Sequence, residues 1–383
     1  MNYITITDFL LSKSASPSII AKGYFNKIPA YFKIFYNGDD ETIKTKSTKA
    51  LLYESNVYKH ISTFEDIDKQ FFIKLLSTMD TTINELVLNK YIKDGNNEVL
   101  QQRMKQLKID IYSKVHIIIT EDTDSINLYT FIDLFSDDKF NKNNFNNLLN
   151  ILNQVFHLVL RGILILNNIF KIQHNDLHFS NILIKTQDTY YKFHQDSKQT
   201  HKSNYKISIF DFDRSYQFDK NNEILDDMCK IGYGCNSLSY KDIFGFVQDI
   251  CYLLIQYDDD KKHPKYFWLS KYLTSLLSEL IPDDDIRIYL YSNAKKNLKK
   301  NLNINSYCLH EEDSEIIYGM PCSDVKKQDE LSSWLGDVYE NFNKFIYKTI
   351  KITEDKKMSY FEKYIKYKNK YLLLKKLNIE QKK

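Results

Sequence analysis

The stretch KIQHNDLHFSNILI, residues 171–184, places a group of polar side chains between two strongly apolar runs. Its centre contains two histidines, one aspartate and two asparagines. Polar groups in an apolar setting are unfavourable unless they form hydrogen bonds, so this concentration needs a reason. We interpret the stretch as a loop for phosphoryl transfer, and the rest of the chain must then supply the other groups that this reaction requires.

Transfer of the terminal phosphate of a nucleotide relies on positioning and on neutralising charge. A carboxylate must take or orient the proton of the acceptor hydroxyl. A second carboxylate and an amide oxygen must hold Mg²⁺, which prefers oxygen ligands. A lysine, itself held by a glutamate, must contact the inner phosphates.

Residues 174–181, HNDLHFSN, fit the pattern H-x-D-L-x-x-x-N, and here the sequence resembles the protein-kinase superfamily. The resemblance extends in the expected order across residues 10–260. Upstream, AYFKIFY contains Lys33 where kinases have V-A-I-K, and LLYESNVYKHI contains Glu54 on the helix that is expected to follow. Downstream, ISIFDFDRS contains Asp211 in the place of the kinase D-F-G motif.

The resemblance implies a role for each of these residues. Asp176 is expected to be the catalytic base. Asn181 and Asp211 are expected to hold Mg²⁺. Lys33 is expected to contact the α- and β-phosphates of ATP and to form an ion pair with Glu54.

Three further polar residues have supporting roles by the same resemblance. His174 is expected to brace the loop through hydrogen bonds. Asp242, at the head of the apolar segment in SYKDIFGFVQDICYLL, resembles the aspartate that braces the catalytic loop in kinases. Asp213 is a rival to Asp211 as the Mg²⁺ ligand, but it lies one register too far along the strand.

The loop that covers the phosphates departs from the family pattern. Kinases have G-x-G-x-x-G there, whereas this chain has SKSASPSIIAKG, with no glycine before Gly23. Pro17 has no backbone N–H to offer to a phosphate. The hydroxyls of Ser14, Ser16 and Ser18 are candidates to contact the nucleotide instead, and a serine-rich hairpin tip without such contacts is the alternative.

The loop at 174–181 and the segment after it also depart from the family. Asn175 stands where kinases carry arginine, and no A-P-E sequence follows Asp211, so activation by loop phosphorylation is not expected. His178 stands where serine/threonine kinases commonly carry lysine. A histidine near pH 7 is mostly neutral and neutralises less phosphate charge than a lysine. D-L-H-x-x-N is found in haspin-like protein kinases and in small-molecule phosphotransferases, and DFDRS is similar to the latter group.

The resemblance implies an α+β fold class with the bilobal architecture of kinases. Residues 1–121 are expected to form a small β-rich N-lobe, with a partly helical elaboration at 63–110. Residues 122–350 are expected to form a larger helical C-lobe, followed by a Lys/Tyr-rich helical tail at 351–383.

Hydrophobic periodicity and turn residues predict the individual elements. Strands are expected at 7–15, 18–26, 30–37, 114–120, 181–184 and 205–213. Helices are expected at 46–62, 143–170, 240–257, 265–281 and 331–350. Ser47 is the expected N-cap of the first helix, and the polar stretch 185–204 is expected to be a surface loop.

Composition and charge exclude several classes of protein. A formal net charge of +3 is too small to indicate a nucleic-acid partner. The apolar stretch 148–170 includes amides, a histidine and an arginine, so we expect a buried helix and no membrane span. The five cysteines are scattered, and Cys308, His310 and Cys322 lack the CxxC pair typical of zinc sites. Scattered cysteines are typical of a reducing compartment, and the sequence shows no signal-peptide pattern. Both features predict a soluble cytoplasmic protein.

The tail has a character of its own. Residues 358–377 repeat apolar side chains along one helical stripe with lysines between them, which indicates either a helix docked on its own domain or one used for self-association. The segment also resembles the Tyr/Lys-rich C-terminal segments of proteins from giant DNA viruses of the mimivirus type. That resemblance implies a viral protein, in the host cytoplasm or in the virion.

These patterns predict an ATP- and Mg²⁺-dependent kinase that transfers phosphate to serine or threonine of proteins, with no nucleic acid or membrane as a partner. A small-molecule kinase of the same fold is one alternative. A pseudokinase that serves as a scaffold is another. The missing glycines favour the scaffold, whereas the complete set of catalytic residue types favours an enzyme.

Overall fold

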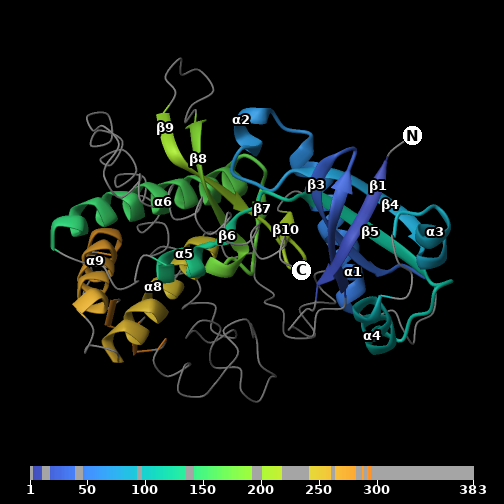
Figure 1. Cartoon of the computed structure of the whole chain (residues 1–383). Helices are drawn as coiled ribbons and strands as arrows, with labels where there is room; N and C mark the ends of the chain where they lie inside the picture. The colour runs from blue at the N-terminus through green and yellow to red at the C-terminus, as the bar shows by residue number, and fades with distance from the viewer. Residues whose placement is uncertain are drawn as a thin grey trace, which may run out of the picture.

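The protein has a mixed α+β fold in which an antiparallel five-stranded sheet and a group of helices occupy different parts of the molecule (Figure 1). In the computed structural model of the chain, the residues described are 3–10, 18–38, 46–92, 97–134, 142–191, 201–217, 241–259, 264–281, 287–288, 291–292 and 294. The α+β class expected from the sequence is confirmed.

The five strands of the sheet are all paired antiparallel with their neighbours. In order across the sheet they are β1 (Ile4–Leu10), β2 (Ser18–Phe25), β3 (Ile28–Tyr36), β5 (Lys114–Glu121) and β4 (Leu75–Thr82). Four of them were predicted, although β1 begins earlier than the predicted start at residue 7. β4 is a correction, because its segment was expected to be only a partly helical elaboration.

That elaboration also contains three short helices, as expected. They are α2 (Asp66–Lys69), α3 (Ile83–Leu88) and α4 (Glu98–Leu107). The side chain of Thr82 accepts a hydrogen bond from the backbone N–H of Glu85, whose carboxylate in turn accepts one from the N–H of Thr82. This capping box ends β4 and begins α3 at the same residue.

Strand β3 presents its two faces to different hydrophobic clusters, because side chains alternate along a strand. Phe32 and Ile34 belong to a cluster formed with α3 and α4. Phe35 belongs to the larger cluster, which includes helix α1 (Lys46–Ser62). Lys33 shares the face of Phe35 and therefore points toward α1. The helix begins one residue before Ser47, so Ser47 is not its N-cap, contrary to expectation.

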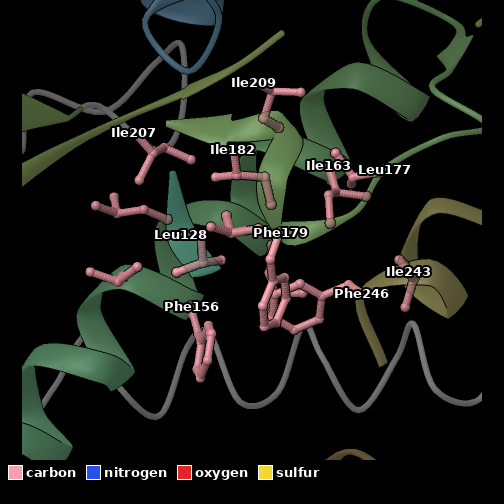
Figure 2. Packing of buried hydrophobic residues seen from close by; sticks show 14 of the residues in the cluster. Leu128, Phe156, Ile163, Leu177, Phe179, Ile182, Ile207, Ile209, Ile243 and Phe246 are labelled. Atoms are coloured by element: carbon pink, nitrogen blue, oxygen red, sulfur yellow. The ribbon is translucent and has the colours of Figure 1, made fainter. Parts of the chain in front are cut away.

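Among the described residues, four helices lie in the other part of the molecule. They are α5 (Leu128–Leu134), α6 (Lys142–Asn168), α8 (Lys241–Asp259) and α9 (Pro264–Leu280). Figure 2 shows Phe156 of α6 beside Phe246 of α8, and their ring centroids are 5.4 Å apart. Phe179 packs on the same Phe246 ring at 5.5 Å, so this aromatic cluster supports the loop that was singled out in the sequence.

Helix α6 includes a stretch, Asn150–Asn168, that is long and apolar enough to cross a membrane. However, 72% of this stretch is buried inside the protein, as in the core helix of a soluble protein. The predicted buried helix is confirmed.

A three-stranded sheet and a two-stranded pair lie around the loop at 171–181. The sheet consists, in order, of β6 (Ile126–Asn127), β8 (Ile182–Tyr191) and β9 (His201–Ile209), the pair consists of β7 (Ile172–Gln173) and β10 (Tyr216–Gln217), and the 3₁₀ turn η1 is Phe179–Asn181. β8 pairs with β9 as far as Tyr191 and His201. The surface loop predicted at 185–204 is therefore wrong at both ends, where the chain continues as a hairpin.

Several predictions lie outside the described residues. They concern Ser14, Ser16, Cys308, His310, Cys322, the helix at 331–350 and the tail at 351–383.

Candidate functional site

Lys33 lies at the centre of the candidate site. Its Nζ atom is 2.7 Å from Oε2 of Glu54 and 2.7 Å from Oδ1 of Asp211. The three residues come from β3, from α1 and from the chain directly after β9. The ion pair expected between Lys33 and Glu54 is present, and Asp211 joins it.

Glu54 is buried because of its position on α1. Leu51, Tyr58 and Ile61 are also buried, and their spacing puts all four residues on one face of the helix. Only 1% of Glu54 is exposed. Burial raises the pKa of Glu54, and the charge of Lys33 acts against this shift and favours the ionised carboxylate.

Asp211 is held in a left-handed backbone conformation, with φ 69°. Aspartate tolerates this conformation better than most residues other than glycine. The backbone N–H of Asp211 donates to the hydroxyl of Tyr58, at 3.2 Å. The next residue, Phe212, is fully buried between the rings of Tyr58 and His174. These contacts direct the carboxylate of Asp211 toward Lys33.

The charges of Lys33 and Asp211 stabilise each other. Burial disfavours the charged amine, but the carboxylates of Asp211 and Glu54 raise the pKa of Lys33 well above its usual value. Burial also disfavours ionised Asp211, but the ammonium group of Lys33 outweighs it, so the pKa of Asp211 is lowered. Both groups are therefore charged near neutral pH.

Carboxylates of α8 hold the backbone of the loop at 171–181 through hydrogen bonds. Oδ2 of Asp242 accepts a hydrogen bond from the backbone N–H of His174 at 2.8 Å, and its Oδ1 accepts one from Asn175 at 3.0 Å. Seven residues further along α8, Asp249 accepts a 2.6 Å hydrogen bond from the N–H of Phe179. The bracing expected of Asp242 is observed, and Asp249 is a second brace that sequence reasoning missed.

Asp176 and Asn181 lie on the braced loop and contact each other. The side-chain amide of Asn181 donates to the backbone carbonyl of Asp176 at 3.0 Å. The carbonyl of Asn181 accepts a hydrogen bond from the N–H of Phe210 at 3.2 Å, directly before Asp211. The loop and the Asp211 segment are therefore fixed side by side.

His174 also joins the loop to that segment, as expected. Its Nε2 is 2.9 Å from the carbonyl of Phe210, and its ring lies 5.0 Å from the ring of Phe212. His174 is fully buried, so it braces the site from inside and is not accessible to a substrate.

Arg214 and His178 both lie near Asp176 in the chain or in space, but they differ in charge. Nη1 of Arg214 lies 3.2 Å from Oδ1 of Asp176. His178 is partly buried, and its Nδ1 accepts a hydrogen bond from the N–H of Ser180. Burial lowers the pKa of His178 to about 4, and His174 adds to this shift, so His178 is neutral at pH 7. Arg214 therefore provides the positive charge beside Asp176.

Asp213 differs from Asp211 in its surroundings. Burial raises the pKa of Asp213 to about 6, and the negative charge of Asp211 adds to the shift. Its buried Oδ1 has no hydrogen-bond partner in the described part of the chain. Lys33 contacts Asp211 directly, which favours Asp211 over its rival as the functional carboxylate.

The donor set can be tested for its fit to Mg²⁺. Asp211 and Asn181 both carry side-chain oxygens, the type of ligand that Mg²⁺ prefers. Within the described ranges, no group of three or more His, Cys, Asp or Glu side chains is arranged to hold a metal ion. Mg²⁺ is usually bound by one or two protein groups together with phosphate oxygens and water, and these two residues fit that kind of site.

The structure thus brings together Lys33, Glu54, Asp176, Asn181 and Asp211. Arg214 and Asp249 were missed, although each had a weak signal. Arg214 lies inside the quoted stretch DFDRS, and Asp249 follows Asp242 at a spacing of seven, which is two turns of a helix.

A scan against protein-family models and a search of curated proteins find no match to this chain.

Proposed function

We propose that this protein is an ATP- and Mg²⁺-dependent phosphotransferase with the bilobal fold of protein kinases, acting on serine or threonine hydroxyls of proteins. The observation that carries the proposal is that Lys33 contacts both Glu54 and Asp211, each at 2.7 Å. An active kinase requires an ion pair between a strand lysine and a helix glutamate, together with an aspartate placed to bind Mg²⁺.

The braced loop supports the same proposal. Asp242 and Asp249 hold its backbone, and Asn181 lies beside the segment that carries Asp211. Catalysis of phosphoryl transfer depends on positioning, so a loop fixed at several backbone atoms suits it.

In this proposal Lys33 binds the α- and β-phosphates of ATP, while Glu54 keeps the ammonium group in place. Asp211 and Asn181 hold Mg²⁺, which neutralises charge on the phosphates when it is bound. A bound cation would offset the repulsion between Asp211 and Asp213, because the charge of Asp211 adds to the rise in the pKa of Asp213.

The transfer step follows from the placement of Asp176. The acceptor hydroxyl oxygen forms a bond to the γ-phosphorus, and the bond from that phosphorus to the bridging oxygen of ADP breaks. The electron pair of the broken bond leaves with ADP. The carboxylate of Asp176 takes the proton of the hydroxyl.

The acceptor could also be a small molecule in place of a protein. The sequence DFDRS favours this second candidate, because it resembles small-molecule phosphotransferases, whereas D-L-H-x-x-N is found in them and in haspin-like protein kinases alike. The chemistry and the residues stay the same, and the test below includes both kinds of acceptor.

The experiment is phosphate transfer from labelled ATP with Mg²⁺, to dephosphorylated casein and, separately, to water and to small hydroxyl compounds such as choline and aminoglycosides. We expect the Asp176→Ala variant to lose at least about 10²-fold in turnover, since a positioned base contributes that much. Its affinity for ATP should stay close to that of the wild-type protein, because Asp176 contacts the acceptor and not the nucleotide.

Unchanged turnover in Asp176→Ala would contradict the role of this residue. Absence of label transfer and of ATP hydrolysis in the wild-type protein, with no rise in melting temperature on adding ATP and Mg²⁺, would favour a scaffold.

A further inference from the structure

The site lacks a cation at the position where the family pattern puts one. His178 lies two residues after Asp176, where a lysine is common, and its Nδ1 accepts a hydrogen bond from the N–H of Ser180. A ring whose Nδ1 accepts a hydrogen bond is not the doubly protonated cation. His178 therefore offers a neutral N–H at most, and no positive charge.

Arg214 brings a positive charge to the same carboxylate from another segment. Its Nη1 is 3.2 Å from Oδ1 of Asp176. About 20% of the Arg214 side chain is exposed, against 7% of Asp176, so the guanidinium lies at the accessible side of the pair.

The backbone of Arg214 is held in this place by the loop itself. The side-chain amide of Asn175 donates to the carbonyl of Arg214 at 3.0 Å. Two residues later, Tyr216 begins β10 and pairs with Gln173 of β7. Asn175 and Gln173 are also linked, through the amide of Gln173 and Oδ1 of Asn175. The position of Arg214 is therefore built into the fold and does not depend on a modified residue.

We infer that Arg214 is a further catalytic residue, whose guanidinium stabilises the transferred phosphoryl group in place of a lysine at position 178. This inference rests on the proposed function and names the residue that completes its site.

The chemistry of arginine suits this task. A guanidinium is always charged and has five N–H donors in one plane, so it can keep one contact to Asp176 and direct others to phosphoryl oxygens. Positive charge at these oxygens matters most in the transition state, where the phosphoryl group is shared between donor and acceptor. Removal of Arg214 should thus affect kcat more than the binding of ATP.

The test compares Arg214→Gln, Arg214→Lys and the double variant Arg214→Gln/His178→Lys with the wild-type protein. Transfer from labelled ATP to dephosphorylated casein gives kcat and the KM for ATP, with hydrolysis of ATP as a second readout. We expect Arg214→Gln to lose about 10²-fold in kcat with less than about 3-fold change in KM. Arg214→Lys should retain more activity, and the double variant should recover about 10-fold over Arg214→Gln because the charge returns from position 178.

Lys202→Gln is the matched control. It also removes one cation from an ion pair, with Asp188 at 2.8 Å, on the exposed hairpin of β8 and β9. We expect it to leave kcat unchanged.

Each result separates the alternatives. Wild-type kcat in Arg214→Gln would overturn the inference while leaving the proposed function in place. Equal losses in all three variants, with lower melting temperatures, would also overturn it, because Arg214 would then be structural. No transfer and no hydrolysis by the wild-type protein would overturn the proposed function, and the inference with it.

Discussion

Asp211 and Asp213 lie two residues apart, yet their carboxylates are in different electrostatic environments. Asp211 contacts Lys33 and has a lowered pKa despite its burial. Asp213 has a pKa raised to about 6 by burial and by the charge of Asp211. Near neutral pH Asp211 is fully ionised, whereas Asp213 retains part of its proton, so Asp211 is the better ligand for a cation.

The two aspartates should therefore differ in their effect on the Mg²⁺ requirement. We expect Asp211→Asn to raise the Mg²⁺ concentration for half-maximal transfer by at least about 10-fold, because a direct ligand loses its charge. Asp213→Asn, the matched control, should raise it less than Asp211→Asn does, because Asp213 is not a direct ligand in this proposal. The measurement is initial rate against Mg²⁺ at saturating ATP. Equal shifts in the two variants would show that the choice between these carboxylates is wrong.

The residues of the site that the sequence could predict are those marked by a motif within a single element or loop, such as Lys33 on β3 and Glu54 on α1. The spacing of Asp176 and Asn181 within one loop identified both of them. Arg214 could not be identified in this way, since its contact with Asp176 depends on how two segments approach each other. The same holds for Tyr58, whose hydroxyl accepts a hydrogen bond from the N–H of Asp211.

Helix α1 carries Glu54 and is tied to the sheet by the residue next to it. The hydroxyl of Ser55 is 3.0 Å from Nε2 of His116 on β5, and Nδ1 of His116 is 2.8 Å from Oδ1 of Asp80 on β4. Ser55 and His116 are buried, and their hydrogen bond joins α1 to two strands. Because Glu54 precedes Ser55 directly, this chain of contacts fixes the position of Glu54 relative to Lys33.

Removal of the hydrogen bond between Ser55 and His116 should make α1 less firmly held and lower the transfer activity. We expect Ser55→Ala to lower the free energy of unfolding by about 1–3 kcal/mol, since it leaves a buried nitrogen of His116 unsatisfied. Transfer activity should fall, because Glu54 holds Lys33 less firmly. Urea unfolding, hydrogen exchange of the α1 amides and kcat test these effects.

Ser62→Ala is the control on the same helix, because the exposed hydroxyl of Ser62 bonds only locally, to the carbonyl of Lys59. Similar stability and activity in the two variants would mean that Ser55 does not position the helix.

At this scale the sequence predicted the elements with clear periodicity and missed those without it. β3 and α1 were predicted within a few residues from their apolar periodicity, and β5 was predicted from a continuous apolar run that is buried in the structure. β4 has no fully buried residue, so only its pairing with β5 makes it a strand. The outer ends of β8 and β9 are polar, and they pair because the hairpin continues.

The molecule as a whole joins a helical core to a polar loop through two carboxylates of α8. Asp242 accepts hydrogen bonds from two backbone N–H groups and from the amide of Asn167, whereas Asp249 accepts one from Phe179. Burial raises the pKa of Asp249 to about 7. The folded protein therefore keeps a proton on Asp249 at pH values where the unfolded chain has released it.

This difference predicts how global stability depends on pH. A folded pKa of about 7 lies above the usual 3.8, so the contribution of Asp249 is greatest below pH 4 and is lost as pH rises to 7. Asp249→Asn cannot ionise and keeps an oxygen to accept from Phe179. From pH 5 to pH 8 we expect its free energy of unfolding to gain about 1–2 kcal/mol on the wild type, less than the full pKa shift implies because the side chain is partly exposed.

Urea unfolding of both proteins at pH 5, 6, 7 and 8 measures this gain. Asp188→Asn makes the same chemical change on exposed strand β8 and should show no such trend, since its carboxylate is solvated in both states. A constant difference between Asp249→Asn and the wild type at all four pH values would mean that Asp249 is ionised throughout. The brace under the loop would then be a charged hydrogen bond, and its loss in Asp249→Asn should destabilise the protein by about 1–3 kcal/mol.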